Sequence, residues 1–247
     1  MIFDWLTLGV IGVLFFSTLV RSAVGFGDAL IAMPLLTIIA GLKTATPLVA
    51  LVAVTISISI LLRHWRSVRF ASAWRLILAS LVGIPLGLLM LKGFHEQYMK
   101  VLLAVLLVGF AAYSLWKPRM LNLKTERSSY AFGFIAGVLG GAYNYNGPAV
   151  VVYSALRRWP PETFRATLQS YLLVTGFLIA AGHGLGGLWN QSVLSLYAIS
   201  LPVVFLSVYL GGLLHKRFPK ETFDRYVYLL LIAIGALLFV NAIMLGG

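Results

Sequence analysis

The sequence predicts an all-α protein that crosses a membrane several times. Of its 247 residues, 60% are hydrophobic and only 11% are charged, whereas a soluble domain carries about 25% charged residues. Apolar runs of nearly membrane-spanning length also recur from one end of the chain to the other. We therefore expect a single transmembrane domain over residues 1–247, as a multi-pass protein of a cell membrane such as a bacterial inner membrane.

The apolar runs are of two kinds. Some are long enough to cross the bilayer alone, which takes roughly 17–25 residues; these are 45–62, 75–91, 98–116, 163–182, 191–214 and 225–245. The remaining runs form two pairs, each joined at a glycine-containing break; the pairs are 5–20 with 24–40, and 128–142 with 147–156. We expect each pair to be either a re-entrant hairpin or one long broken helix.

The two breaks are the most informative feature of the chain. The first reads Gly-Phe-Gly-Asp from Gly25, and the second reads Asn-Tyr-Asn-Gly-Pro from Asn144. No water reaches backbone groups in the hydrocarbon core, so a broken helix is tolerated there only where it is buried in protein or lines a cavity. A matched pair of breaks in two halves is the best sequence pointer to the binding site of a transporter.

The breaks belong to two predicted internal repeats, residues 1–120 and 128–247. Gly25 and Asn144 lie 119 positions apart, and the matching glycines Gly87 and Gly211 lie 124 apart. If each pair is a hairpin, each half crosses the membrane three times. Because three is odd, the second half is then inverted relative to the first, and the breaks face each other near the middle of the membrane.

The basic residues favour the hairpin over a single crossing. With hairpins, the basic segments share one side and both termini lie on the other; these segments are 63–75, 117–127, 157–165 and 216–225. Cytoplasmic loops carry an excess of Lys and Arg, so the termini are expected outside. If each pair crossed only once, the basic segments would fall on both sides. We prefer hairpins because they explain the asymmetry.

Several classes of function are excluded. The net charge of +12 is spread over short connections, as expected for topology signals and contacts with anionic lipids rather than nucleic acid. The chain has no cysteine, and its four histidines lie in separate loops without ligand spacing. No phosphate-binding loop or serine nucleophile motif is present. We therefore expect that the protein is not an enzyme and that it holds no cofactor and no metal ion. Assembly into a homo-oligomer is compatible with the sequence.

At the breaks, the chain resembles the sulfite exporter TauE/SafE family of membrane permeases. Residues 25–34 are similar to the family's glycine-rich stretch, apolar run and proline. Gly140-Gly141, followed by Gly147-Pro148 and Tyr153, is similar to the family's second repeat. The stretch Phe164-Arg165-Ala166-Thr167 is similar to a later family motif. The resemblance covers nearly the whole chain. It implies an all-helical permease that exports sulfite, a sulfonate or a related organic acid.

Candidate substrate-binding residues gather at the breaks. Half-helices that begin there would point their positive ends inward, which suits an anion. Polar side chains beside them could replace the hydration shell of that anion. Close packing of small residues and interhelical hydrogen bonds would explain the same residues without a substrate. The candidates are Arg21, Ser22, Gly25, Gly27, Asp28, Tyr143, Asn144, Asn146, Gly147 and Gln169; the family commonly has glycine where Asp28, Asn144 and Asn146 stand.

Arg21 and Asp28 are charged residues on either side of the first break, in a stretch that is otherwise apolar. A cation at mid-depth costs about 2.5–3.5 kcal/mol on insertion scales, so it is usually functional or paired. Arg21 could hold a sulfonate or carboxylate through two hydrogen bonds, pair with Asp28, or extend to the membrane interface. Asp28 could carry a coupled proton or only neutralise Arg21.

We therefore expect a membrane permease that exports a small anion. Without an ATP-binding motif, the driving force must be the membrane potential or an ion gradient. An interior-negative membrane favours anion export by about 2.3 kcal/mol per charge per 100 mV. The alternatives are an uptake permease or channel for another small anion, and a membrane scaffold that transports nothing.

Overall fold

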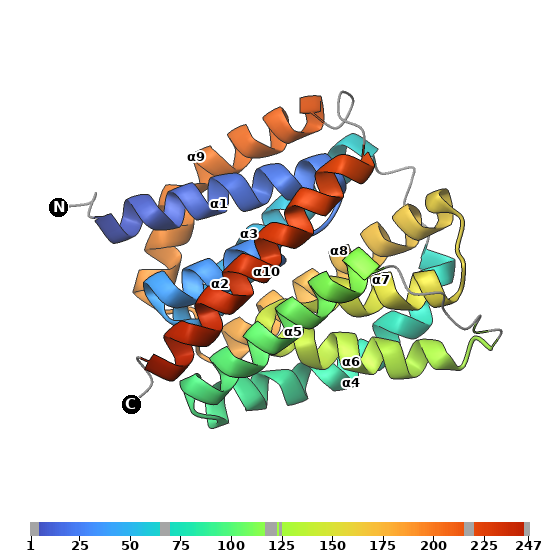
Figure 1. The fold of residues 1–247 in the computed structure, drawn as a ribbon, viewed down its shortest axis with the longest axis horizontal. Helices are drawn as coiled ribbons and strands as arrows, with labels where there is room; N and C mark the ends of the chain where they lie inside the picture. Colours follow the sequence, from blue (N-terminus) through green and yellow to red (C-terminus); the bar gives the residue numbers. More distant parts are fainter. Residues whose placement is uncertain (1–4, 65–69, 117–122, 124, 215–219, 245–247) are drawn as a thin grey trace.

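The computed structural model describes residues 5–64, 70–116, 123, 125–214 and 220–244. These residues form helices and no strand (Figure 1), which confirms the all-α prediction. The helices are α1 (Trp5–Val24), α2 (Asp28–Ala40), α3 (Leu42–His64), α4 (Phe70–Gly93), α5 (Glu96–Trp116), α6 (Ser128–Tyr143), α7 (Asn146–Leu156), α8 (Pro161–Leu185), α9 (Gln191–Leu214) and α10 (Lys220–Met244).

Within the described residues, six helices are long and apolar enough to cross a membrane, namely α1, α3, α4, α5, α8 and α9. All but α1 were predicted to span alone. We expected α1 to be a shorter arm of a pair, and this was wrong: α1 has 20 residues, which corresponds to about 30 Å. The predicted span at 225–245 lies in α10, whose described apolar part is Tyr228–Met244.

The paired runs fold back as hairpins. Helix α1 packs on α2, and α6 packs on α7. Gly25 and Gly27 both have a φ of 102°, and Asn144 has a φ of 58°. Glycine adopts such positive values without a steric penalty and asparagine tolerates them, so these residues permit a sharp reversal of the chain. The alternative of one long broken helix therefore does not apply to either pair.

The helix directions can be followed in Figure 1. Helices α1, α3 and α5 run from left to right, whereas α6, α8 and α10 run from right to left. Helix α2 returns from its break to the left edge, and α7 returns from its break to the right edge. Helix α1 begins and α10 ends at the left edge. The helix ends that flank the basic segments are the right-hand ends of their helices in this view, although residues 65–69, 117–122, 124 and 215–219 of those segments lie outside the described residues.

Glycines bring two pairs of helices into close contact. Helix α4 packs on α6 through residues that lack a side chain: Gly83, Gly87, Gly133, Gly137 and Gly141. Helix α9 packs on α1 at Gly211, where an added Cβ would lie 2.7 Å from the carbonyl oxygen of Leu19. Small residues let helix backbones approach closely in membranes, where dispersion contacts replace the hydrophobic effect between helices.

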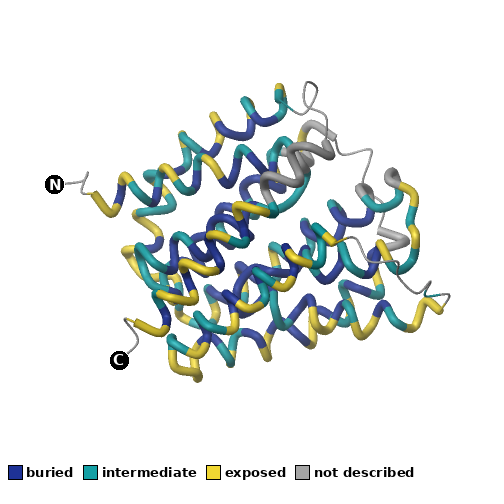
Figure 2. Tube along the Cα trace, viewed as in Figure 1, coloured by how far each residue is buried: buried dark blue, intermediate teal, exposed yellow. Residues whose placement is uncertain are grey.

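Burial separates the centre from the rim of the molecule. Figure 2 shows buried residues concentrated along the central helices and exposed residues along the outer faces. Large apolar side chains on the outer faces of α1, α4, α5 and α9 are exposed; examples are Phe16, Leu89, Val105 and Phe205. Such faces suit lipid tails, which are as apolar as leucine. Among the polar residues at the breaks, Arg21, Asp28, Asn144 and Asn146 are buried.

The hairpins lead to a prediction about membrane sidedness. Cysteines introduced at Arg127 and Arg158, both exposed, should react with an impermeant thiol reagent from the same side of the membrane. A cysteine at the exposed Asn190 should react only from the other side. Labelling in intact cells and in inverted vesicles, using this naturally cysteine-free chain, provides the measurement. Labelling of positions 127 and 158 from opposite sides would contradict the hairpin at α6 and α7.

Candidate functional site

Both breaks line one cavity. The centres of water molecules can occupy about 30 Å³ of it, which is room for about two waters. Its walls come from the break between α1 and α2, the break between α6 and α7, and the middle of α3 and α8. Six of the predicted binding residues line it: Arg21, Gly27, Asp28, Asn144, Asn146 and Gly147.

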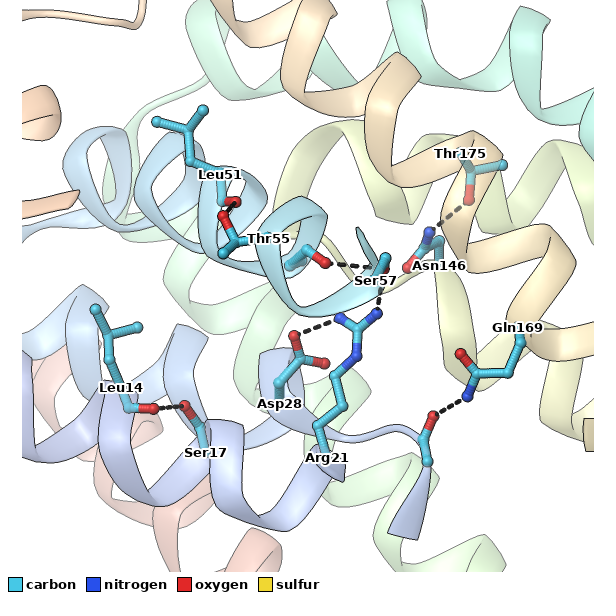
Figure 3. A network of polar contacts seen from close by, with 12 residues as sticks. Leu14, Ser17, Arg21, Asp28, Leu51, Thr55, Ser57, Asn146, Gln169 and Thr175 are labelled. Carbon is cyan, nitrogen blue, oxygen red and sulfur yellow. Dashed lines mark hydrogen bonds and ion pairs between the residues drawn. The ribbon is translucent and has the colours of Figure 1, made fainter. Parts of the chain in front are cut away.

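Arg21 is the central cation of this site. Its side chain is 3% exposed, and its Nη1 donates to Oδ2 of Asp28 over 2.7 Å. Its Nη2 donates to Oγ of Ser57 on α3, also over 2.7 Å (Figure 3). Its Nε is buried and has no hydrogen-bond partner in the structure. Arg21 thus points inward, and its extension to the membrane interface is ruled out.

Two helices begin at the cavity. Helix α2 starts at Asp28 after Gly27, and α7 starts at Asn146 after Tyr145. Neither helix has a side-chain hydrogen bond at its N-cap. The first N–H groups of a helix lack intrahelical partners and carry a partial positive charge. Because the first residues of both helices line the cavity, two such positive ends meet there.

Hydrogen bonds hold the second break against three neighbouring helices. Asn144 Nδ2 donates to the carbonyl oxygen of Thr46 on α3 over 2.7 Å. Tyr145 Oη donates to the carbonyl oxygen of Leu30 on α2 over 3.2 Å. Asn146 Nδ2 donates to Oγ1 of Thr175 on α8 over 2.9 Å, as Figure 3 shows. Buried amide and hydroxyl groups that are bonded in this way have defined orientations.

Four predicted binding residues lie outside the cavity wall. Gln169 Nε2 donates to the carbonyl oxygen of Gly25 over 2.8 Å and so ties α8 to the first break. Tyr143 is buried and donates from Oη to the carbonyl oxygen of Met99 on α5. Ser22 lies against Gly211 of α9. Gly25 and Gln169 therefore support the site from outside, whereas Ser22 and Tyr143 contact neighbouring helices.

Two hydroxyl residues that hold the predicted polar side chains in place were not themselves predicted. Ser57 binds Arg21, and Thr175 binds Asn146. Each hydroxyl also donates to the carbonyl oxygen four residues earlier in its own helix. Serine and threonine commonly satisfy themselves in this way within helices, so nothing in the sequence distinguishes these two from other hydroxyl residues in apolar runs.

Comparison with known proteins places the chain in a family. The family model described as sulfite exporter TauE/SafE matches residues 10–238. The chain belongs to the TauE/SafE family. The match includes both breaks and every residue that lines the cavity. TauE/SafE proteins are transporters rather than enzymes, so this chain is a membrane transporter, and the scaffold alternative is excluded.

A curated relative agrees with the family assignment. The chain is similar to the probable inner membrane transporter protein TsaS of Comamonas testosteroni, with 27% identity over 178 residues, which cover 70% of this chain and 73% of the relative. No solved structure matches the chain. TauE/SafE membership and the apolar spans confirm that the chain is a multi-pass protein of the cell membrane.

Proposed function

We propose that this TauE/SafE transporter exports a small anion, such as sulfite, a sulfonate or a related organic acid, through the cavity between the breaks. The observation that carries the proposal is the buried, unpartnered Nε of Arg21, a residue that lines the cavity where two helices begin. A buried donor without a partner costs about 1–3 kcal/mol. A bound anion would accept that hydrogen bond and lie at both positive helix ends.

We also propose that residues 1–120 and 128–247 act as inverted repeats. The opposite directions of α1 and α6, of α3 and α8, and of α5 and α10 support this relation. So do the glycine contacts: an added Cβ at Gly87 would meet the carbonyl oxygen of Val138, and one at Gly211 would meet that of Leu19. Leu19 and Val138 lie 119 positions apart, the same spacing as the breaks.

The cross-connections suggest how the cavity opens. Gln169 of the second half binds Gly25 at the first break, and Asn144 at the second break binds Thr46 of the first half. Each break is therefore held by a helix of the opposite half. In transporters with inverted repeats, one part rocks against the other around a central site. In such a movement, each break would move together with the half of the chain to which it is hydrogen-bonded. The cavity would then open to one side of the membrane at a time.

The proposal predicts a potential-dependent flux of anions. Purified protein in liposomes should release a radiolabelled sulfonate faster than protein-free liposomes, and an interior-negative potassium diffusion potential should accelerate the release. Uptake without release would favour the alternative of an uptake permease. Equal flux with and without protein would contradict transport of these anions.

Two variants connect this flux to the cavity. Asn146→Ala should lower it about tenfold, because it removes an amide from the cavity wall and the hydrogen bond to Thr175. Tyr143→Phe changes a neighbouring residue outside the cavity, where only the bond to Met99 is lost, and should leave the flux nearly unchanged. Similar losses in both variants would indicate that the residues act through packing alone.

A further inference from the structure

We infer that Asp28 makes this site select singly charged anions over doubly charged ones. The inference rests on the proposed anion transport and concerns only the charge of the substrate. Among the described residues that line the cavity, Arg21 and Asp28 carry the formal charges. Their charges sum to zero, so the side chains alone do not compensate the charge of an incoming anion.

The geometry keeps Asp28 close to whatever binds Arg21. A guanidinium has five N–H donors, and the structure uses Nη1 for Asp28 and Nη2 for Ser57. An anion that reaches the free Nε therefore shares one planar group with the carboxylate of Asp28 (Figure 3). Asp28 is 8% exposed, so water screens the repulsion between the two negative groups poorly.

The remaining positive charge matches one negative charge. The N-termini of α2 and α7 each contribute roughly half of a positive charge. Added to Arg21 and Asp28, they leave roughly one positive charge in total. Ser57 and Asn146, which face the same centre (Figure 3), bring dipoles but no charge. A singly charged anion balances this total, whereas a doubly charged anion leaves an excess negative charge beside a buried carboxylate.

If Asp28 only held Arg21 in place, its charge would not influence the choice of substrate. The two roles differ in one measurable quantity, the change at Asp28 variants in the ratio of fluxes for two anions of different charge. Radiolabelled ethanesulfonate and 1,2-ethanedisulfonate share a two-carbon skeleton and differ by one sulfonate group, and this difference in size is the same for every variant. Proteoliposomes should be clamped at zero potential, so that the driving force does not depend on charge.

Wild-type protein should transport ethanesulfonate at least about tenfold faster than the disulfonate, and Asp28→Asn should shrink this ratio about tenfold. Ser57→Ala is the matched control, because it removes the other hydrogen bond of Arg21 without changing the charge. It should lower both fluxes and keep their ratio. An unchanged ratio in Asp28→Asn would overturn the inference but leave the proposed function intact. Failure of wild-type protein to transport either anion would overturn both.

A measurement on wild-type protein covers the case in which Asp28→Asn does not fold. The melting temperature in detergent should rise with added ethanesulfonate and not with the disulfonate at equal ionic strength, since a ligand that binds only the folded state stabilises it. Equal shifts for the two salts would overturn the selection by charge.

Discussion

Arg21→Gln alone should destabilise the transporter strongly. The change leaves the carboxylate of Asp28 buried without its partner, which lies 2.7 Å away in the structure. Asp28→Asn alone should have a similar effect, because it leaves the guanidinium of Arg21 unpaired. Breaking a buried pair from one side typically costs about 3–5 kcal/mol. The melting temperature in detergent, without added anion, measures the loss.

The double variant separates stability from transport. Arg21→Gln combined with Asp28→Asn removes both charges and should restore most of the melting temperature, because the residues are in contact and their effects do not add. Flux should stay low, since the N–H donors of Arg21 are gone. Full recovery of flux would show that Arg21 does not bind the anion and that Arg21 and Asp28 form only a structural ion pair.

The partly exposed pair of Glu96 and Lys100 provides the control. Its atoms lie 3.0 Å apart, with side chains that are 38% and 20% exposed. Lys100→Gln should change stability by about 1 kcal/mol or less, because ion pairs near the surface are weak. A loss as large as that of Arg21→Gln would show that burial does not explain the effect at Arg21.

Gly87→Val should prevent correct assembly of the helices. A Cβ at Gly87 would lie 2.1 Å from the carbonyl oxygen of Val138 and 2.8 Å from the amide nitrogen of Ala142. Both atoms belong to the backbone of α6, so no side chain can move aside, and α4 and α6 must separate along their contact. We expect little monodisperse protein in size-exclusion chromatography.

The matched control lies on α5. Nothing lies within 4 Å of a Cβ built at Gly109, so Gly109→Ala should be tolerated or should stabilise by up to about 1 kcal/mol through helix propensity. Gly211→Val should resemble Gly87→Val, because its Cβ would also meet backbone, at the Leu19 carbonyl. A Gly87→Val protein that elutes and melts like wild type would contradict the close contact of α4 with α6.

The sequence alone determined the class of the protein, most spans and the two breaks. These features follow from quantities that are local in the chain, namely apolar length and the placement of glycine. The error at α1 has the same origin. Arg21 interrupts the apolar run, and we placed its end before this residue, yet the helix continues through Arg21 because Asp28 and Ser57 satisfy the charge.

Only the tertiary structure decided which polar side chains meet. Periodicity places residues on one face of a helix, but it does not determine how that helix is rotated against its neighbours. Ser22 and Arg21 are adjacent in sequence, yet one lies against Gly211 of α9 and the other reaches Ser57 of α3. Thr175 joins the site because α8 packs on α7. Contacts between such distant segments depend on the packing of several helices at once, which no single stretch of sequence encodes.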